Sequence, residues 1–220
     1  MSTAGADAPT LRVSEIFHSL QGESTRVGLP TVFVRLTGCP LRCAWCDTAY
    51  AFTGGEAMTL AAILKQVAAF GCPTVCVTGG EPLAQPHCLA LLTALCDAGY
   101  SVSLETSGAL DIGGVDPRVA RIMDLKAPDS GECARNRWEN LDLLGPGDEI
   151  KLVLASTADY DWAKSVLAER RLAARCPVLL SPVADRLVPA HLAEWILRDR
   201  LPVRFQLQLH KTLWGNERAR

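Results

Sequence analysis

Short apolar segments rich in β-branched residues alternate along most of the chain with segments of helical periodicity. The expected strands cover residues 31–36, 73–77, 100–105, 119–125, 149–154, 177–181 and 203–208, and the expected helices cover 59–70, 86–98, 134–144, 157–172 and 189–199. Strands separated by helices favour a parallel sheet with right-handed crossover connections. Seven strands are too few for a closed eight-stranded barrel, so the pattern predicts an α/β fold with an open, partial (β/α) barrel.

The length of the chain predicts one domain, because 220 residues are enough to bury a single sizeable apolar core. We expect this domain to span residues 1–220, with residues 1–10 as an N-terminal extension. A net charge of −2 gives no electrostatic reason to bind nucleic acid or an anionic membrane. We therefore expect neither as a partner.

The first ten residues lack a charged start followed by an apolar core, so no signal peptide is expected. No apolar run approaches the length of a membrane span. Nine cysteines without a secretory signal indicate a reducing compartment and metal or thiol chemistry rather than disulfide bonds. These features predict a cytoplasmic protein.

Three of the cysteines, Cys39, Cys43 and Cys46, have C-x3-C-x2-C spacing. Structural zinc sites usually have four ligands, and His18 is the only further candidate near in sequence. A [4Fe–4S] cluster held by three thiolates would instead leave one iron open to a small molecule. Zinc and plain core thiols remain alternatives. We interpret five of the other cysteines as core side chains: Cys72, Cys76, Cys88, Cys96 and Cys176. The sixth, Cys133, is expected to be partly exposed.

Glycine and polar residues follow two of the expected strands, in Thr78-Gly79-Gly80-Glu81-Pro82 and Glu105-Thr106-Ser107-Gly108. Glycines let the backbone approach a ligand closely, and its N–H and C=O groups can then bind a zwitterion. A plain tight turn is the alternative. Because active sites of parallel α/β folds lie at the carboxyl ends of the strands, we expect both segments to lie beside the cysteine loop.

The cysteine spacing followed by Gly-Gly-Glu-Pro resembles the radical S-adenosylmethionine (SAM) enzymes. Within them, further segments are similar to the 7-carboxy-7-deazaguanine synthase family: Ile16–Glu23, Gly28–Cys39, Cys46–Thr48, Glu105–Gly108, Asp124–Lys126 and Gln208–Gly215. The resemblance implies a lyase that rearranges 6-carboxy-5,6,7,8-tetrahydropterin to 7-carboxy-7-deazaguanine with loss of ammonia, on the route to queuosine and other 7-deazapurines. It also implies a [4Fe–4S] cluster, SAM and Mg²⁺ as cofactors, a homodimer, and a reducing partner such as flavodoxin or ferredoxin.

The resemblance also implies a role for individual residues. The cluster ligands are Cys39, Cys43 and Cys46, and the Mg²⁺ ligand is Thr48. SAM contacts are implied for Trp45, Cys46, Asp47, Gly80, Ser107, Lys126 and Ser181. Substrate contacts are implied for Leu20, Gln21, Gly22, Glu23, Arg35, Thr78 and His210. No catalytic side chain is implied beyond the cluster and SAM, because the cofactor supplies the radical.

Two charged residues in this set have structural alternatives. Arg35 ends an apolar strand, and its planar guanidinium suits the carboxylate of the substrate, but a salt bridge, for example to Glu23, is the alternative. Lys126 could hold SAM or form an ion pair with Asp124. Both alternatives stay open on the sequence.

Thr48 and His210 are also ambiguous, because Thr48 could be a helix N-cap or turn residue and His210 a structural group. Two features depart from some family members. The cysteine loop has the compact spacing, without a helical insertion, and the chain continues past the His-Lys motif, so the role of a terminal carboxylate is not assigned to Arg220.

Two other functions remain as alternatives. A radical SAM activating enzyme that acts on a partner protein would share the compact cysteine spacing, but it has no need of a preset carboxylate site such as Arg35. A structural metal or Fe–S binding module would need a fourth ligand near the cysteines.

Overall fold

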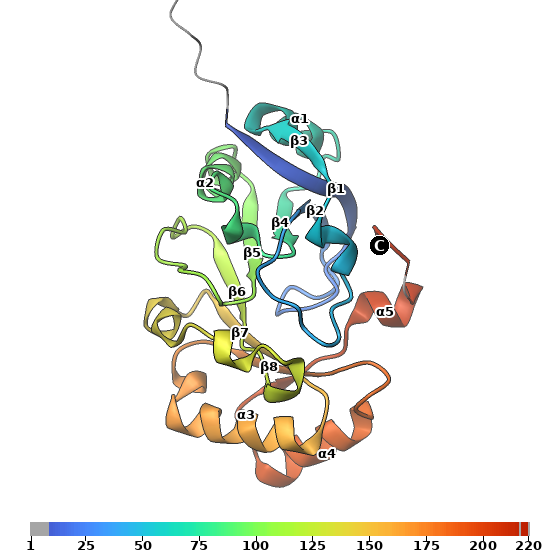
Figure 1. Cartoon of the computed structure of the whole chain (residues 1–220), viewed down its shortest axis with the longest axis vertical. Coiled ribbons are helices and arrows are strands. Elements are labelled where there is room, and N and C mark those ends of the chain that lie inside the picture. The colour runs from blue at the N-terminus through green and yellow to red at the C-terminus, as the bar shows by residue number, and fades with distance from the viewer. Residues whose placement is uncertain (1–8, 216, 220) are drawn as a thin grey trace, which may run out of the picture.

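The structure, a computed structural model, describes residues 9–215 and 217–219. Nine strands form one sheet in the order β3-β1-β2-β4-β5-β6-β7-β8-β9 (Figure 1). They are β1 (Thr10–Leu20), β2 (Pro30–Leu36), β3 (Glu56–Thr59), β4 (Thr74–Gly79), β5 (Ser101–Thr106), β6 (Ala120–Asp124), β7 (Glu149–Leu154), β8 (Val178–Pro182) and β9 (Arg204–Phe205). The strands β2-β4-β5-β6-β7-β8-β9 pair with one another in parallel, in that order. Strand β1 is antiparallel to both of its neighbours, β2 and β3. The sheet is not closed, which confirms the predicted open (β/α) barrel.

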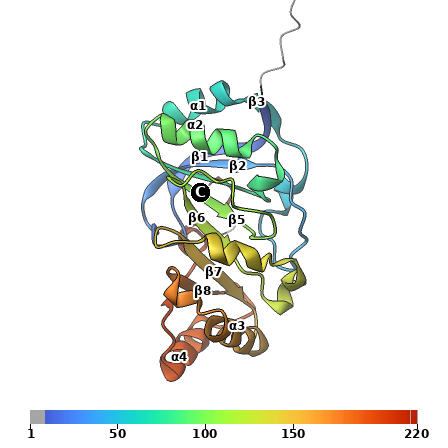
Figure 2. The same ribbon diagram turned by 90° about the vertical axis from the view of Figure 1, so that its left-hand side faces the viewer.

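Four α-helices lie on the outer side of the curved sheet, with α1 and α2 at one end and α3 and α4 at the other (Figure 2). They are α1 (Leu60–Ala68), α2 (Cys88–Asp97), α3 (Thr157–Glu169) and α4 (Pro189–Asp199), and a short helix, α5 (Leu209–Trp214), follows β9. Thr59 caps α1 by accepting a hydrogen bond from the Ala62 N–H at 3.2 Å, and Ser156 caps α3 in the same way. The helices pack on the sheet through a continuous apolar core.

Strand β1 contains a β-bulge that divides it in two. Pairing with β2 passes from Val13 opposite Leu36 to Glu15 opposite Arg35, so β1 has one extra residue at Ser14. Before the bulge, Val13 belongs to the core under the helices. After it, alternate residues face the inside of the barrel, where Phe17 stacks on Phe33 at 5.0 Å between ring centroids. The bulge thus changes which side chains of β1 face the inside.

The turn between β1 and β2 spans the open side of the barrel. The Ser24 N–H donates to Gln206 Oε1 at 2.9 Å, and Gln206 Nε2 donates back to the Ser24 carbonyl at 2.8 Å. The Thr25 N–H donates to Glu149 Oε2 at 2.9 Å. Side chains therefore join the first and last parts of the sheet where no strand pairing does.

The predicted helix over 134–144 is wrong. This segment forms two short 3-10 turns, Cys133–Arg135 and Trp138–Leu143. Two asparagine side chains take backbone partners outside the segment: Asn136 bonds both the N–H and the carbonyl of Lys126, and Asn140 donates to the carbonyls of Gly108 and Leu110. These bonds compete with a regular helix.

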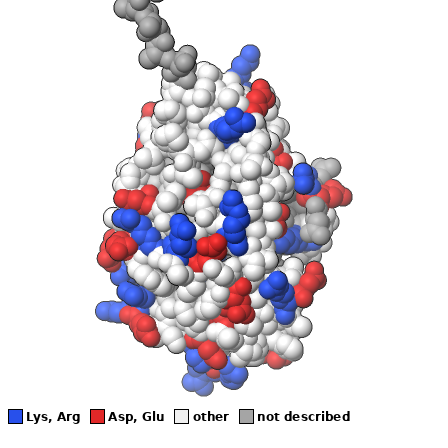
Figure 3. Space-filling view, in the orientation of Figure 1, with Lys and Arg blue, Asp and Glu red and all other residues white. Residues whose placement is uncertain are grey.

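Strands β1 and β3 and helix α5 were not predicted. The N-terminal extension expected over residues 1–10 lies almost wholly outside the described residues, and β1 already begins at Thr10. No described helix is both long and apolar enough to cross a membrane. Acidic and basic side chains are interspersed on the face drawn in Figure 3.

Candidate active site

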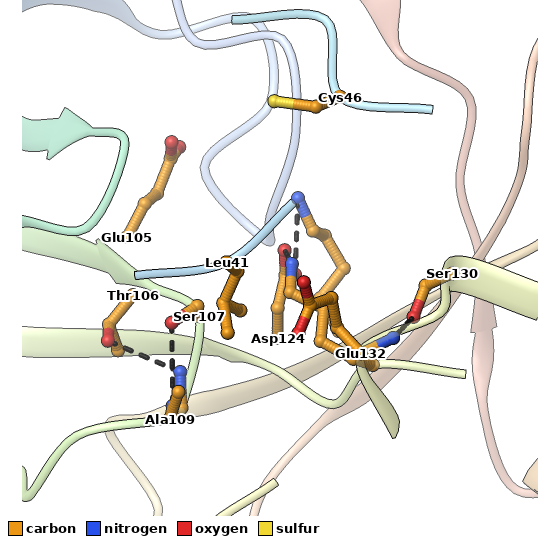
Figure 4. A network of polar contacts seen from close by, with 12 residues as sticks. Leu41, Cys46, Glu105, Thr106, Ser107, Ala109, Asp124, Ser130 and Glu132 are labelled. Atoms are coloured by element: carbon orange, nitrogen blue, oxygen red, sulfur yellow. Dashed lines mark hydrogen bonds and ion pairs between the residues drawn. The ribbon is translucent and has the colours of Figure 1, made fainter. Parts of the chain in front are cut away.

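A cavity of about 390 Å³ lies at the carboxyl ends of the parallel strands. All the site residues predicted from the sequence except Ser181 line it: Leu20, Gln21, Gly22, Glu23, Arg35, Cys39, Cys43, Trp45, Cys46, Asp47, Thr48, Thr78, Gly80, Ser107, Lys126 and His210. In Figure 4 the side chains of Cys46 and Glu105 extend toward the same open space from opposite sides. The structure thus brings residues from both ends of the chain to one place.

The cysteine loop begins directly after β2 and is held by backbone contacts on both sides of Cys43. The Arg42 N–H donates to Glu132 Oε1 at 2.5 Å, and the Ala44 N–H donates to the Ser130 carbonyl at 3.0 Å. Burial raises the pKa of the Cys39 and Cys43 thiols. A bound metal would displace the thiol protons and stabilise the thiolates.

The three thiols fit a cluster better than a single metal ion. All nine cysteines are free, and Cys39, Cys43 and Cys46 line the cavity. In the part of the chain that is described, no three Cys, His, Asp or Glu side chains converge on a point where one ion could be bound. A cubane cluster takes one thiolate per iron, so its ligands need not converge in this way. His18, the candidate fourth zinc ligand, lies on an exposed part of β1 beside Phe70.

The Gly-Gly pair at the end of β4 packs directly against the start of the cysteine loop. Gly79 has φ +154°, and a Cβ atom there would lie 2.2 Å from the Leu36 carbonyl oxygen. A Cβ on Gly80 would lie 2.3 Å from the carbonyl oxygen of Gly38. Only glycine permits this close approach, whatever ligand contact Gly80 also makes.

Glu81 connects the ends of β4 and β5. Its carboxylate is fully buried and accepts hydrogen bonds from Thr106 Oγ1 at 2.9 Å, the Ser107 N–H at 2.7 Å and the Leu83 N–H at 3.0 Å. Its own N–H donates to the Gly38 carbonyl at 2.8 Å. Glu81 therefore fixes the cysteine loop relative to Ser107, one of the predicted SAM contacts.

A row of alternating charges lies along one side of the cavity. Lys151 on β7 contacts the carboxylate of Glu23 and lies 3.3 Å from Asp124 Oδ1, and Lys126 lies 2.8 Å from Asp124 Oδ2. Burial alone would raise the pKa of Asp124, but the two ammonium groups outweigh it and lower the pKa. Lys126 thus forms the ion pair that the sequence left as an alternative and also lines the cavity.

Arg35 forms a salt bridge, the structural alternative that the sequence left open, but Glu23 is wrong as its partner. Arg35 Nε donates to Glu15 Oε1 at 2.7 Å, while Glu23 binds Lys151 and accepts from Gln208 Nε2 at 2.5 Å. Pairing across β1 and β2 explains the partner, because Glu15 lies directly opposite Arg35.

A second carboxylate, Glu105, lies between two of the predicted substrate contacts. It accepts from Thr78 Oγ1 at 2.8 Å and from Gln21 Nε2 at 3.2 Å. No Lys, Arg or His in the described residues forms an ion pair with it. Its carboxylate can therefore accept further donors from a ligand in the cavity.

Helix α5 forms one wall of the cavity. The Leu209 N–H donates to the Gly22 carbonyl at 2.9 Å, and a Cβ on Gly22 would lie 2.1 Å from Nδ1 of His210. Lys211 Nζ lies 3.2 Å from Asp47 Oδ2. Burial lowers the pKa of His210, so its imidazole is neutral at pH 7. This neutral ring can accept or donate one hydrogen bond in the cavity.

Thr48 and Ser181 differ in how the structure places them. Thr48 precedes the 3-10 turn Ala49–Phe52 without capping it through its side chain, and its Oγ1 lies 3.8 Å from Cys46 Sγ at the cavity wall. Ser181 is fully buried beside the cavity rather than in its wall, and its Oγ has no hydrogen-bond partner in the described residues.

Sequence reasoning missed several side chains that shape the site: Glu15, Tyr50, Glu81, Glu105, Lys151, Gln208 and Lys211. For Lys151 the detectable signal is a basic residue among the apolar side chains of Glu149–Leu154, and for Glu105 it is a carboxylate near the end of the strand Ser101–Thr106. Such a residue on a buried strand needs a polar partner or a ligand.

An open parallel barrel with three cavity-lining thiols after its first parallel strand, and a Gly-Gly pair at the end of the next, has the architecture of a radical SAM domain. The Radical SAM superfamily model matches residues 33–169. Within that superfamily the chain belongs to the 7-carboxy-7-deazaguanine synthase family.

Two relatives support this assignment, and one solved structure shares the fold. The chain is 52% identical to the 7-carboxy-7-deazaguanine synthase of Chlorobaculum tepidum, over 95% of this chain and 96% of the relative. It is 41% identical to that of Koribacter versatilis, over 94% and 98% of the two chains. The fold is similar to the crystal structure of QueE from Escherichia coli, with TM-score 0.71 and 24% identity over 91% and 95% of the chains.

Proposed function

We propose that this protein is a radical SAM lyase that rearranges 6-carboxy-5,6,7,8-tetrahydropterin to 7-carboxy-7-deazaguanine with loss of ammonia, in the biosynthesis of queuosine and other 7-deazapurines. The observation that carries the proposal is the placing of the Arg35 guanidinium and two carboxylates, Glu23 and Glu105, in the same cavity as three free thiols. A pterin carboxylate matches the guanidinium, and the N–H groups of the pterin match the carboxylates.

Cys39, Cys43 and Cys46 would hold the [4Fe–4S] cluster, and the two glycines at the end of β4 would lie beside it. When bound together, cluster and SAM would supply the radical chemistry that starts the rearrangement. We propose that SAM is bound by residues of the cysteine loop, of the strand ends and of β8: Trp45, Cys46, Asp47, Gly80, Ser107, Lys126 and Ser181. Ser181 belongs to this set through the family resemblance, since its buried hydroxyl lies outside the cavity wall and has no hydrogen-bond partner in the described residues.

The substrate would be held from both ends. Arg35 binds its carboxylate, and the segment from Leu20 to Glu23 reads its donor and acceptor edge, with Thr78 and His210 as further contacts. Lys151 holds the Glu23 carboxylate in place, so that it can accept hydrogen bonds from the substrate. Such an arrangement fixes the orientation of a planar pterin as well as its position.

We propose Thr48 as the protein ligand of Mg²⁺. Its hydroxyl lies at the cavity wall and does not cap the turn that follows it. Mg²⁺ commonly takes one or two protein groups and completes its octahedral coordination with waters and substrate oxygens. The substrate carboxylate would supply one of those oxygens.

We also propose a homodimer in the cytoplasm that receives electrons from a small reducing protein such as flavodoxin or ferredoxin. Nine free cysteines support a reducing compartment. The dimer and the reducing protein are properties that the family resemblance implies. Sedimentation of the purified protein would test the dimer, and cluster reduction by each candidate donor would test the partner.

The decisive test is anaerobic turnover of the reconstituted, reduced protein with SAM and 6-carboxy-5,6,7,8-tetrahydropterin, with and without Mg²⁺, followed by mass spectrometry. We expect 7-carboxy-7-deazaguanine with SAM largely unconsumed, and faster turnover with Mg²⁺. Cleavage of SAM to 5′-deoxyadenosine with the pterin untouched would favour an activating enzyme that acts on a protein. Absence of an iron–sulfur cluster would favour a structural metal module.

A further inference from the structure

We propose that Glu15 and Tyr50 are positioning residues for Arg35: they hold its guanidinium by the Nε edge, so that its two terminal amino groups face the cavity and receive the substrate carboxylate. This inference rests on the proposed function. It adds two residues to the site that the sequence motifs left without a role.

The β-bulge in β1 is the first observation behind the proposal. In a regular strand Glu15, two positions after Val13, would share the face of Val13, which packs under the helices. With the bulge, Glu15 lies opposite Arg35 and on the same inner face as Phe17. Bulges next to active sites commonly redirect a side chain in this way.

The hydrogen bonds around Glu15 are the second observation. Arg35 Nε donates to Glu15 Oε1 at 2.7 Å, and the Tyr50 hydroxyl donates to the same oxygen at 2.8 Å. Glu15 is therefore held by a second group and does not depend on Arg35 alone for its position.

Aromatic rings restrict the guanidinium from its sides. Its central carbon lies 5.7 Å from the ring centroid of Phe17 and 6.0 Å from that of Tyr50, and the side chain of Arg35 is only 15% exposed. On the Tyr50 ring, Arg218 lies at 4.1 Å. The guanidinium thus has little freedom to turn about its long axis.

The remaining donors of Arg35 decide what it can bind. Within the described residues, its two terminal amino groups have no hydrogen-bond acceptor, while its Nε donates to Glu15. Two parallel N–H groups at the end of a guanidinium match the two oxygens of a carboxylate. Because Tyr50 follows Cys46 and Thr48 in the same loop, this geometry also fixes the carboxylate relative to the cluster ligands.

The pair Arg35–Glu15 could have a different role, and the two roles predict effects of opposite sign. If Glu15 only neutralised Arg35, removing its charge would free the guanidinium and tighten the binding of a carboxylate. If Glu15 positions Arg35, the same change weakens that binding. If Glu15 positions Arg35, the change should not alter the binding of a ligand that lacks the carboxylate.

The test measures equilibrium binding of two probes to the anaerobic, cluster-loaded, SAM-saturated enzyme: 6-carboxy-5,6,7,8-tetrahydropterin, and 5,6,7,8-tetrahydropterin, which lacks the carboxylate. We expect Glu15→Gln to raise the dissociation constant of the carboxylated probe about tenfold, which is about 1.4 kcal/mol, and to leave the other probe unchanged. In turnover, KM should rise more than kcat falls. In an Arg35→Lys background, Glu15→Gln should have no further effect.

Two additional variants complete the design. Tyr50→Phe removes only the hydroxyl and should weaken the carboxylated probe selectively, whether or not the Glu15 variant folds well. Glu194→Gln, at an exposed position of α4, makes the same chemical change far from the cavity and should alter neither probe.

Unchanged or tighter binding of the carboxylated probe by both the Glu15 and Tyr50 variants would overturn the inference alone, as would equal weakening of the two probes. If the unsubstituted enzyme binds SAM but neither pterin, the proposed function fails, and the inference fails with it. Selective loss of the carboxylated probe supports both.

Discussion

Lys211 on helix α5 forms an ion pair with Asp47 in the cysteine loop, with Nζ and Oδ2 3.2 Å apart. The contact joins the last helix of the chain to the segment that carries the proposed cluster ligands. Burial would raise the pKa of Asp47, but Lys211 outweighs it and lowers the pKa. The carboxylate therefore stays ionised at neutral pH and fixed in direction.

Replacing Lys211 should affect ligand binding more than stability. Asp47 is almost half exposed, so Lys211→Met should change the free energy of unfolding by less than about 1 kcal/mol. SAM affinity should fall several-fold, because Asp47 loses the partner that orients it. Equilibrium binding of SAM to the cluster-loaded protein checks this, with exposed Lys65→Met as the control. Unchanged SAM affinity would show that Lys211 does not orient Asp47 for SAM binding.

Gly22 should not tolerate a side chain. A Cβ there would lie 2.1 Å from His210 Nδ1 and 3.2 Å from His210 Cβ, so Gly22→Ala must displace the His210 side chain and loosen the packing of α5 on the cavity wall. We expect a loss of about 1–3 kcal/mol in the free energy of unfolding and faster proteolysis near residues 207–215. Gly147→Ala is the matched control, because a Cβ there meets nothing within 4 Å. Equal behaviour of the two variants would show that α5 does not pack as described.

The buried carboxylate of Glu81 should be important for stability. Glu81→Gln replaces one of its two acceptor oxygens by an amide NH₂ that faces N–H and O–H donors. We expect a loss of about 2–3 kcal/mol in the free energy of unfolding, measured by urea denaturation of the metal-free protein. Glu194→Gln, at an exposed position, should leave that value unchanged. A Glu81 variant as stable as this control would contradict the hydrogen-bond assignment.

The row of charges from Glu23 to Lys126 sets a pH dependence of stability. The lowered pKa of Asp124 gives a contribution that is present above the unfolded value of about 3.9 and is lost as pH falls through the folded value. The raised pKa values of Lys126 and Lys151 give a contribution that is present below about 10.4 and is lost as pH rises through their folded values. Between about pH 5 and 9 these groups should leave stability constant.

Removal of Lys151 tests that row directly. Lys151→Met leaves Glu23 and Asp124 without a shared partner, and should lower the free energy of unfolding by about 3 kcal/mol across the same pH range. Urea denaturation at pH 5, 7 and 9 measures both quantities. If the free energy of unfolding changes with pH between 5 and 9 in the unsubstituted protein but not in the Lys151 variant, a group of this row titrates in that range.

Each of the three cavity-lining cysteines should be needed for iron. Cys43→Ala should lose the absorbance near 400 nm and most of the bound iron after reconstitution, because the cluster then has two thiolates. Cys133→Ala is the control, since Cys133 is a free thiol that does not line the cavity. Iron loss in both variants would point to a different ligand set.

Much of the fold could be predicted because buried parallel strands have a clear pattern. Strand β4, for example, is apolar until it reaches Thr78 and the glycines, and Pro189 marks the start of α4. Strand β1 escaped because its bulge breaks the alternation at Ser14 and because polar residues follow it. Periodicity of two cannot be recognised across an inserted residue.

The site residues came from motifs, whereas the contacts that hold them came only from the fold. Arg35 was expected to bind a carboxylate, but its partner Glu15 lies twenty positions earlier and becomes its neighbour only through strand pairing. Likewise Lys151 meets Glu23 across the cavity. The failed helix at 134–144 has a similar cause, since the hydrogen-bond partners of Asn136 and Asn140 lie in distant turns.

The bulge in β1 also divides the strand by what each half can tolerate. Leu11 and Val13 need only be apolar and of suitable volume, so a designer could exchange them for other aliphatic residues at small cost. From Glu15 onward, polar side chains such as Glu15 must keep the direction of their hydrogen bonds. An exchange that matched only their volume would lose these bonds. Ser14 is therefore the position at which this strand can lose a residue without exchanging its faces, because its deletion would leave Val13 and Glu15 as consecutive residues opposite Leu36 and Arg35.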